Sequence, residues 1–262
     1  MDPSAELLEF AEDPGAFVAL GADEERIRTD RFTVTFSPGA HRWSTSVQRL
    51  RLSDDVEGTV AEVRRLMVER DRSAAVWQAG PSATPEDVIQ QLLALGMEAE
   101  YGDGSTILVL TEQPPAVSSP FAVRRAATYA DHRAAIEVSI EGFGFDDMDA
   151  EDERRRARET FTTERSGGHT FRLLALDGDR PVATLQAWRS RVGLYVGGAT
   201  TLPPDRRRGA MSTLLTACWG EAARGGTPSL VALGGHMSTA LMERLGFTPH
   251  GRVQHLIDRL PR

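Results

Sequence analysis

A strand–loop–helix pattern that ends in Leu-Gly and a hydrophobic residue occurs twice in the chain. The first copy spans 76–97 and the second 231–247, and they align when a five-residue insertion is allowed. In both copies a short apolar segment, a loop of small residues and a short helical pattern follow one another, and a longer helical pattern precedes them. Alternating strands and helices are typical of a sheet covered by helices. The repeat therefore favours two similar α/β (α+β) units, although two ordinary strand–helix segments would give the same pattern.

Proline and serine are concentrated in 111–120, which has no periodicity and separates the two copies. Such a segment is typical of a linker. We therefore expect a first domain over 1–115, a linker over 116–120 and a second domain over 121–262. Charge differs between the halves, because 21 acids and 10 arginines precede residue 121, whereas 17 acids and 20 arginines follow.

Hydrophobic periodicity and turn residues locate the individual elements. Asp54 or Asp55 is expected to begin a helix as its N-cap, and Thr84 another. In the first half we expect helical segments in 1–30 and strands at 32–36, 43–52 and 74–78. We also expect one helix that ends near 70, another that ends near 95, and a hairpin around 102–104. In the second half we expect strands at 121–126, 171–176, 181–190, 191–202, 229–235 and 252–260, and helices at 131–140, near 150–161, at 209–223 and 238–245.

The basic residues exclude several classes of protein. The 30 basic residues are all arginine, so a Walker-type nucleotide site and a pyridoxal Schiff base, which both need lysine, are excluded. A net charge of −8 argues against nucleic acid as a partner. The lone Cys218 permits neither an internal disulfide nor a cysteine-rich metal site, and we expect no metal.

Hydropathy gives an expectation about location. The sequence has no apolar run near the ~20 residues that a membrane-spanning helix needs. Its first ten residues carry acids, not the basic and apolar regions of a signal peptide. We therefore expect a cytoplasmic protein without a membrane partner, and we leave a homodimer open.

One segment, 200–226, has the features of a ligand-binding site. A strand ending at Leu202 leads through Arg206, Arg207 and Arg208 to Gly209, and a long amphipathic helix follows. The start of a helix presents unpaired N–H groups and a positive dipole end, and a glycine lets a ligand approach the backbone closely. This arrangement suits a phosphate group, although an exposed arginine run would look the same.

The segment PPDRRRGAM resembles motif A of the GNAT superfamily of acyl-CoA-dependent N-acyltransferases, whose pattern is Arg/Gln-x-x-Gly-x-Gly/Ala. Arg206 and Gly209 match its first two fixed positions. The segment 229–247 resembles the second CoA-side motif of the family, and the element order of 121–262 matches the GNAT fold. The first half resembles a degenerate GNAT unit of a tandem member, because 53–63 has Asp54, Asp55 and Glu57 in place of the arginines.

The resemblance implies transfer of an acetyl or other acyl group from CoA to an amine of a small molecule. It implies Glu141 or His236 as the base, and an oxyanion contact at Thr201. It also implies a set of residues that hold acetyl-CoA: Thr200, Thr201, Arg206, Arg207, Arg208, Gly209, Ala210, Met211 and Ser212.

The segment 141–153 is rich in acids, and in the family this region covers the acceptor pocket. The carboxylates of Glu141, Asp146 and Asp147 would suit a cationic amine there, whereas acids at 149–153 also fit an ordinary helix start. Trp188, Tyr195 and Trp219 are expected in the core.

Two departures from the family pattern bear on activity. Met211 stands where the motif has Gly or Ala, so its side chain must turn away from the phosphates. Met242 stands where many GNAT enzymes have a tyrosine that protonates the CoA thiolate. The alternatives to an N-acetyltransferase are therefore a catalytically impaired acyl-CoA-binding or partner-binding module and a GNAT-like acyl-thioester decarboxylase.

Overall fold

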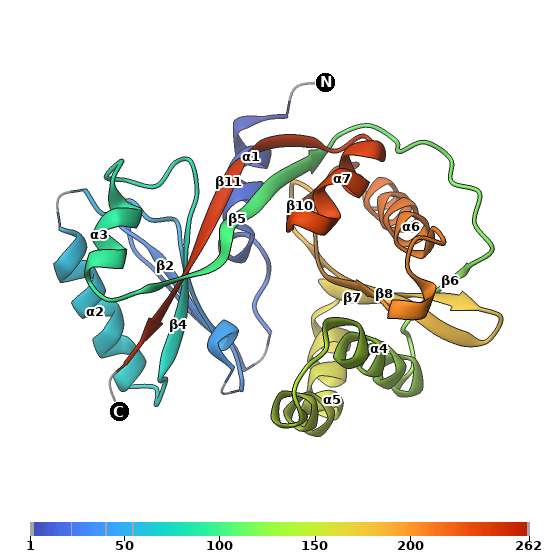
Figure 1. Ribbon diagram of the computed structural model, residues 1–262, viewed down its shortest axis with the longest axis horizontal. Coiled ribbons are helices and arrows are strands. Elements are labelled where there is room, and N and C mark those ends of the chain that lie inside the picture. Colours follow the sequence, from blue (N-terminus) through green and yellow to red (C-terminus); the bar gives the residue numbers. More distant parts are fainter. Residues whose placement is uncertain (1–2, 22, 40, 54, 261–262) are drawn as a thin grey trace.

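The computed structural model describes residues 3–21, 23–39, 41–53 and 55–260. In this part of the chain one twisted sheet of eleven strands runs through both halves of the molecule, with helices on its faces (Figure 1). The first half contains α1 (Ala5–Glu12), β1 (Glu25–Arg28), β2 (Thr33–Phe36), β3 (Thr45–Gln48), α2 (Val56–Val68), β4 (Ala74–Ala79), α3 (Val88–Ala94) and β5 (Glu98–Leu110), with 3₁₀ turns at Pro14–Ala16 and Arg42–Ser44.

The second half repeats the order β1–β2–β3–α2–β4–α3–β5 after one additional strand and two additional helices. It contains β6 (Ala122–Arg125), α4 (Tyr129–Phe143), α5 (Asp147–Gly167), β7 (Thr170–Asp177), β8 (Arg180–Arg189), β9 (Leu194–Thr201), a 3₁₀ turn (Pro203–Asp205), α6 (Ala210–Arg224), β10 (Leu230–Gly234), α7 (His236–Arg244) and β11 (Thr248–Arg259).

Each half has one parallel strand pair joined by a helix. β3 and β4 are parallel with α2 between them in sequence, and β9 and β10 are parallel with α6 between them. The other strand pairs are antiparallel. This confirms the expected fold class of two similar, mixed and mostly antiparallel units flanked by helices.

The last strands of the two halves cross over. The order of the sheet is β1-β2-β3-β4-β11-β5-β10-β9-β8-β7-β6, so β11 lies between β4 and β5, and β5 pairs with β10. Figure 1 shows β5 and β11 running together through the centre of the molecule. The two halves are therefore joined by continuous backbone hydrogen bonding. The domain limits 1–115 and 121–262 remain a prediction about how the chain divides.

Three apolar clusters hold the layers together. In the first half α2 and α3 pack on β2, β3 and β4 around Trp77 and Met67, which are fully buried. In the second half α6 and α7 pack on one sheet face around Leu185 and Leu214. At the joint, α1 buries Phe10 against β5 and β10. This joint places the amino-terminal helix over the centre of the sheet.

Some expectations for the first half are wrong, and the backbone shows why. Residues 25–28 form the edge strand β1, not a helix, because they pair with β2. Thr84 does not cap α3, because its N–H and C=O bond to Leu50 and Leu52 at 3.1 and 2.9 Å and the helix begins only at Val88. The expected hairpin at 102–104 is a bulge in the continuous strand β5, which pairs with β11 on both sides of it.

Asp55 is confirmed as the N-cap of α2, since its side chain accepts a hydrogen bond from the Gly58 N–H. Asp54 lies outside the described residues. Within the described part of the chain, no helix combines the length and apolarity that crossing a membrane requires.

Candidate functional site

A fork opens in the sheet where β9 separates from β10. The two strands pair only at their first residues, ending at Val196 opposite Ala232. Beyond this point β9 bulges against β8 at Gly198, whose φ is +55°, while β10 continues along β5 to Gly234. Within the described residues, 197–201 therefore have a strand neighbour on one side only. The backbone on the open side is free to bind an extended ligand, as a sheet edge does.

The start of α6 lies directly after this fork and is uncapped. Gly209 is its N-cap, with φ of +94°, and no side chain accepts from the first turn. The first backbone hydrogen bond of the helix runs from the Thr213 N–H to the Gly209 carbonyl at 3.0 Å. The N–H groups of 210–212 thus lack a helical acceptor. Side chains cap the helices α1, α2, α4 and α5, whereas α3 and α7, like α6, begin without such a cap.

A side chain at Gly209 would not meet a clash. Atoms of Ser119, 3.9 Å away, are the nearest ones that a β-carbon at Gly209 would meet. An open glycine, unpaired N–H groups and the positive end of a 15-residue helix together form an anion-binding geometry.

The three arginines of the loop have different partners. Arg206 donates to the carbonyls of Thr201 and Gly142 at 3.1 and 3.0 Å, so it ties the end of β9 to the end of α4. Arg207, with φ of +65°, is exposed and has no hydrogen bond or ion pair within the described part of the chain.

Arg208 is engaged by carboxylates and by an aromatic ring. It bonds Asp177 and Asp205 at 2.9 and 2.6 Å, and its guanidinium group lies 5.0 Å from the centre of the Phe121 ring. Asp205 is buried and also bonds Arg180 at 2.9 Å. The hydrogen bond from Arg180 lowers the pKa of Asp205, which keeps this buried carboxylate charged. Of the three loop arginines, Arg207 is thus the one that has no partner within the described residues.

The other residues expected to hold acetyl-CoA form the walls of this region. Thr200, Ala210 and Ser212 are buried, and Thr201 is half-buried. Met211 packs against the core of the second half, so its side chain points away from the open space before Gly209. Together with the loop arginines and Gly209, these residues lie at the carboxyl end of β9 and the start of α6.

Glu141 and His236 lie on different elements. Glu141 is exposed on α4 and lines a cavity with Glu137, Arg154 and Pro181. His236 is exposed at the first residue of α7, directly after β10. No hydrogen bond or ion pair among the described residues joins them. The structure therefore places His236 at the end of the strand that borders the fork, and Glu141 beside Gly142 of α4, which contacts Thr200 of β9.

Met242 is a core residue. Its side chain is 5% exposed and packs in the same cluster as Leu110, Ala232 and Phe247. A methionine side chain has no proton to donate, so Met242 only fills space in the core.

Two aromatic residues beside the fork were expected to be core residues only. Trp188 and Tyr195 have ring centres 5.3 Å apart, and a β-carbon at Gly197 would lie 3.0 Å from the Trp188 ring and 3.3 Å from the Tyr195 hydroxyl. Burial raises the pKa of Tyr195 to about 12, so its hydroxyl stays protonated and can donate a hydrogen bond. The signal in the sequence is the spacing of Tyr195 two residues before Gly197, which puts both on one face of a strand.

In the first half, the corresponding helix start is that of α2, where acidic side chains of the helix itself lie at the N–H groups. The Asp55 carboxylate accepts from the Gly58 N–H at 3.0 Å and lies 3.6 Å from Arg31, and Glu57 stands in the first turn. Carboxylates at this position occupy the donors and repel an anion.

No protein-family model matches the chain, and no curated protein matches it in sequence. Solved structures do match it. A GCN5-related N-acetyltransferase from Kribbella flavida is 15% identical, with a TM-score of 0.70 over 97% of this chain and 96% of that chain. A tandem GNAT protein from the clavulanic acid biosynthesis pathway is 15% identical, with a TM-score of 0.60 over 100% and 90% of the two chains.

A GCN5-related N-acetyltransferase from Sphaerobacter thermophilus is 19% identical, with a TM-score of 0.60 over 87% and 80% of the two chains. The expected resemblance is therefore confirmed: this chain has the tandem GNAT fold. At these identities the likeness establishes the fold alone.

Proposed function

We propose that this chain is an acyl-CoA-dependent N-acyltransferase that moves an acetyl or other acyl group from CoA to an amine of a small molecule. The observation that supports it best is the uncapped start of α6, open in front of Gly209, immediately after the fork between β9 and β10. A helix start binds phosphate groups and an open strand edge binds an extended amide chain. Acyl-CoA contains both, in this order, and ends in a reactive thioester.

The residues of the chain have defined roles in this proposal. The N–H groups at the start of α6 would hold the pyrophosphate, with Arg207 adding charge at its exposed edge. The backbone at Thr200 and Thr201 would bind along the open side of β9, and an N–H there would polarise the thioester carbonyl. The Tyr195 hydroxyl is protonated at neutral pH and can donate a hydrogen bond beside the bulge.

The proposed reaction is balanced as follows. The amine nitrogen attacks the carbonyl carbon, the C–S bond breaks, the amine gives up a proton, and the leaving sulfur gains one. His236 and Glu141 are the proposed proton carriers, with His236 placed at the end of β10. A thiol has a pKa of ~8.5, so the sulfur can also leave as thiolate and take its proton from water.

A second candidate has one observation in its favour. The buried Met242 is no proton donor, and a chain that has lost this group could bind acyl-CoA without transferring it. Such a protein would be a binding module with the same fork and the same helix start.

Calorimetry with acetyl-CoA, followed by thiol release with a panel of amines, tests the proposal. The wild-type chain should bind acetyl-CoA and release CoA only when an amine is present. Arg207→Glu should weaken binding about tenfold, because one uncommitted cation becomes an anion near the pyrophosphate. Arg28→Glu is the matched control, since Arg28 is exposed on β1 and also has no partner within the described residues.

The outcomes separate the alternatives. Binding without turnover on any amine would favour the binding module. Release of carbon dioxide from malonyl-CoA without an amine would favour the decarboxylase. Absence of acetyl-CoA binding in the wild-type chain would refute the proposal.

A further inference from the structure

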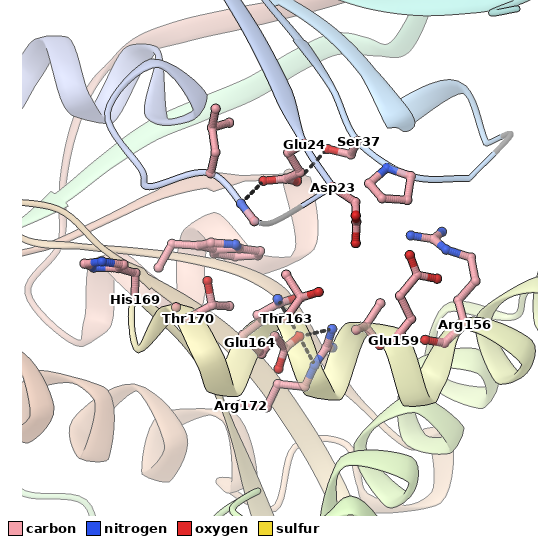
Figure 2. Close-up of a pocket in the computed structure, with 17 residues that line it drawn as sticks. Asp23, Glu24, Ser37, Arg156, Glu159, Thr163, Glu164, His169, Thr170 and Arg172 are labelled. Atoms are coloured by element: carbon pink, nitrogen blue, oxygen red, sulfur yellow. Dashed lines mark hydrogen bonds and ion pairs between the residues drawn. The ribbon is translucent and has the colours of Figure 1, made fainter. Parts of the chain in front are cut away.

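A cavity of about 150 Å³ lies between the two halves of the molecule. Its upper wall is formed by residues 20, 21, 23 and 24 and by the turn at 37–38 of the first half, and its floor is α5 with the first residues of β7 (Figure 2). The two halves touch at its edge, because a β-carbon at Gly21 would lie 2.7 Å from the Thr163 side chain. Its volume suits a small molecule.

The lining of this cavity carries more negative than positive charge. Four carboxylates and two guanidinium groups face it. Both guanidinium groups have partners: Arg172 pairs with Glu164 at 2.9 Å, and Arg156 lies 3.7 Å from Asp152. The remaining cationic candidate is His169, which is exposed at one end.

Two of the four carboxylates are already satisfied. Glu24 accepts from the Gly21 N–H and from the Ser37 hydroxyl, both at 2.7 Å. Glu164 accepts from Gln186 and Arg172 at 3.0 Å. Burial favours its neutral form, but the hydrogen bond from His132 and the charge of Arg172 outweigh burial and lower the pKa of Glu164.

Asp23 and Glu159 are the carboxylates without partners. Neither has a hydrogen bond or ion pair within the described part of the chain, and both are exposed toward the cavity. Figure 2 shows Asp23 directed down from the loop and Glu159 directed up from α5, so that two anions reach into the cavity from opposite walls. Like charges that share a cavity attract a cation.

The cavity reaches β8, the strand that pairs with β9 at the bulge, and the lining residues described include none of β9 or β10. Gln186 and Trp188 line the cavity, and both lie on β8 beside the bulge, since Gln186 pairs with Gly197 and Trp188 with Tyr195. The loop 206–209 follows the other end of β9. Gly197 and Gly198 therefore lie between the two regions, and two ligands that meet at the bulge would approach it from opposite ends of the strand.

Resting on the proposed function, we propose that the cavity between the halves is the acyl-acceptor site and that it selects a small primary amine in its ammonium form, held by Asp23 and Glu159 over the Trp188 ring. A cation over an indole face is attracted by the ring. The ammonium gives up a proton, which solvent at the open end passes to the carriers proposed above. Its nitrogen then attacks the thioester carbonyl at the bulge, and the C–S bond breaks. The acylated nitrogen is neutral, so the carboxylates that attract the ammonium group do not retain the amide.

This assignment gives the first half a direct part in substrate binding. Asp23 belongs to the degenerate unit and Glu159 to the second, so the site is incomplete unless the halves are assembled. These two acids are not the three that the sequence suggested for the amine, Glu141, Asp146 and Asp147: Asp146 caps α5, and Asp147 lies in its first turn.

The test uses the full chain with acetyl-CoA and two probes, 1,5-diaminopentane and 2-phenylethylamine, with the N,N′-diacetylated diamine and N-acetyl-2-phenylethylamine as uncharged controls. In Asp23→Asn/Glu159→Gln the KM for both amines should rise about tenfold, while the KM for acetyl-CoA and kcat stay within about twofold. Glu153→Gln, which lies nearer the start of α5 and outside the cavity lining, is the matched control. The conservative Glu159→Asp should recover part of the loss.

A binding measurement keeps the inference separate from turnover. Titration of the amines should change tryptophan fluorescence in the wild-type chain, and Trp188→Phe should abolish the change. Wild-type chain that binds acetyl-CoA but shows no amine binding, or a double variant that behaves like Glu153→Gln, would overturn the acceptor site while leaving the proposed function intact. Loss of acetyl-CoA binding in the wild type would refute the proposed function instead.

Discussion

The two parallel strand pairs of this molecule have the same topology, but the helices that connect them begin with different N-cap residues. In β3–α2–β4 the helix begins with a capping aspartate and an acid in the first turn, whereas in β9–α6–β10 it begins with a glycine in the left-handed region and no acid. Both helices have a dipole and free donors at this end. The difference shows that a few residues at the N-cap, not the fold, decide whether a helix start is closed by its own side chain or left open for an anion.

The helices that follow in the two halves, α3 and α7, have a buried apolar side chain at the same position. Leu92 lies four residues before Gly96, and Met242 lies four residues before Gly246. Their side chains are 0% and 5% exposed, and each belongs to the core of its half. The position that carries a tyrosine in many GNAT enzymes is therefore a packing position in both halves of this chain.

The largest effect is expected from separating the halves. In a fragment of residues 121–262, β11 would lose β4 and β5, and β10 would lose β5. Asp258, which is fully buried and bonds Arg64 of α2 at 2.8 Å, would lose its partner, and an unpaired buried charge costs several kcal/mol. We expect a fragment that aggregates or lacks a cooperative melt, as measured by size-exclusion chromatography and circular dichroism. A monodisperse fragment as stable as the full chain would show that the halves fold independently.

The sequence predicts the second half of the fold better than the first. The hairpin β7–β8 and the helix α6 could be located because turn residues, alternation and a glycine bound them. The crossing of β5 and β11 could not, because each strand is an apolar segment whose pattern does not name its neighbour. The bulge at Gly102 and Gly104 looks like a hairpin turn in sequence, since both features need positive φ.

For the candidate site, the sequence locates the open helix start but not the partners of its arginines. Arg208 pairs with Asp205, three residues away in the same loop, and with Asp177 at the end of β7, which only the fold brings near. The cavity with Asp23 and Glu159 is likewise invisible in sequence, because 136 positions separate its two carboxylates.

The next largest effect is expected from giving α6 the start of α2. Gly209→Asp should weaken acetyl-CoA binding about 100-fold, or ~2.7 kcal/mol, because a carboxylate would occupy the N–H groups and repel the pyrophosphate. Gly209→Asn is the control, since it carries the same strain at φ of +94° without the charge. Calorimetry that gives equal affinities for the two variants would mean that the charge at this position does not matter.

A smaller effect is expected at the packing position of α7. Met242→Tyr should lower the free energy of unfolding by ~1–3 kcal/mol, because a larger, polar side chain is forced into a filled core. Leu92→Tyr in α3 should have a similar effect on stability. Urea unfolding measures both, and thiol release measures turnover for the first. A faster Met242→Tyr enzyme with an unchanged melt would show that the position faces the leaving sulfur after all.

The smallest effect is expected from removing the cap of α2. Asp55→Ala loses the hydrogen bond from the Gly58 N–H and should reduce the free energy of unfolding by ~1 kcal/mol, and Asp55→Asn, which retains an acceptor, should reduce it less. Neither variant should acquire acetyl-CoA binding at α2, because Glu57 remains in the first turn and no arginine run precedes the helix. Calorimetry checks this through the stoichiometry, which should stay at one acetyl-CoA per chain. A second equivalent bound by Asp55→Ala would mean that the aspartate cap alone separates the closed helix start from the open one, and that the arginines around Gly209 contribute little.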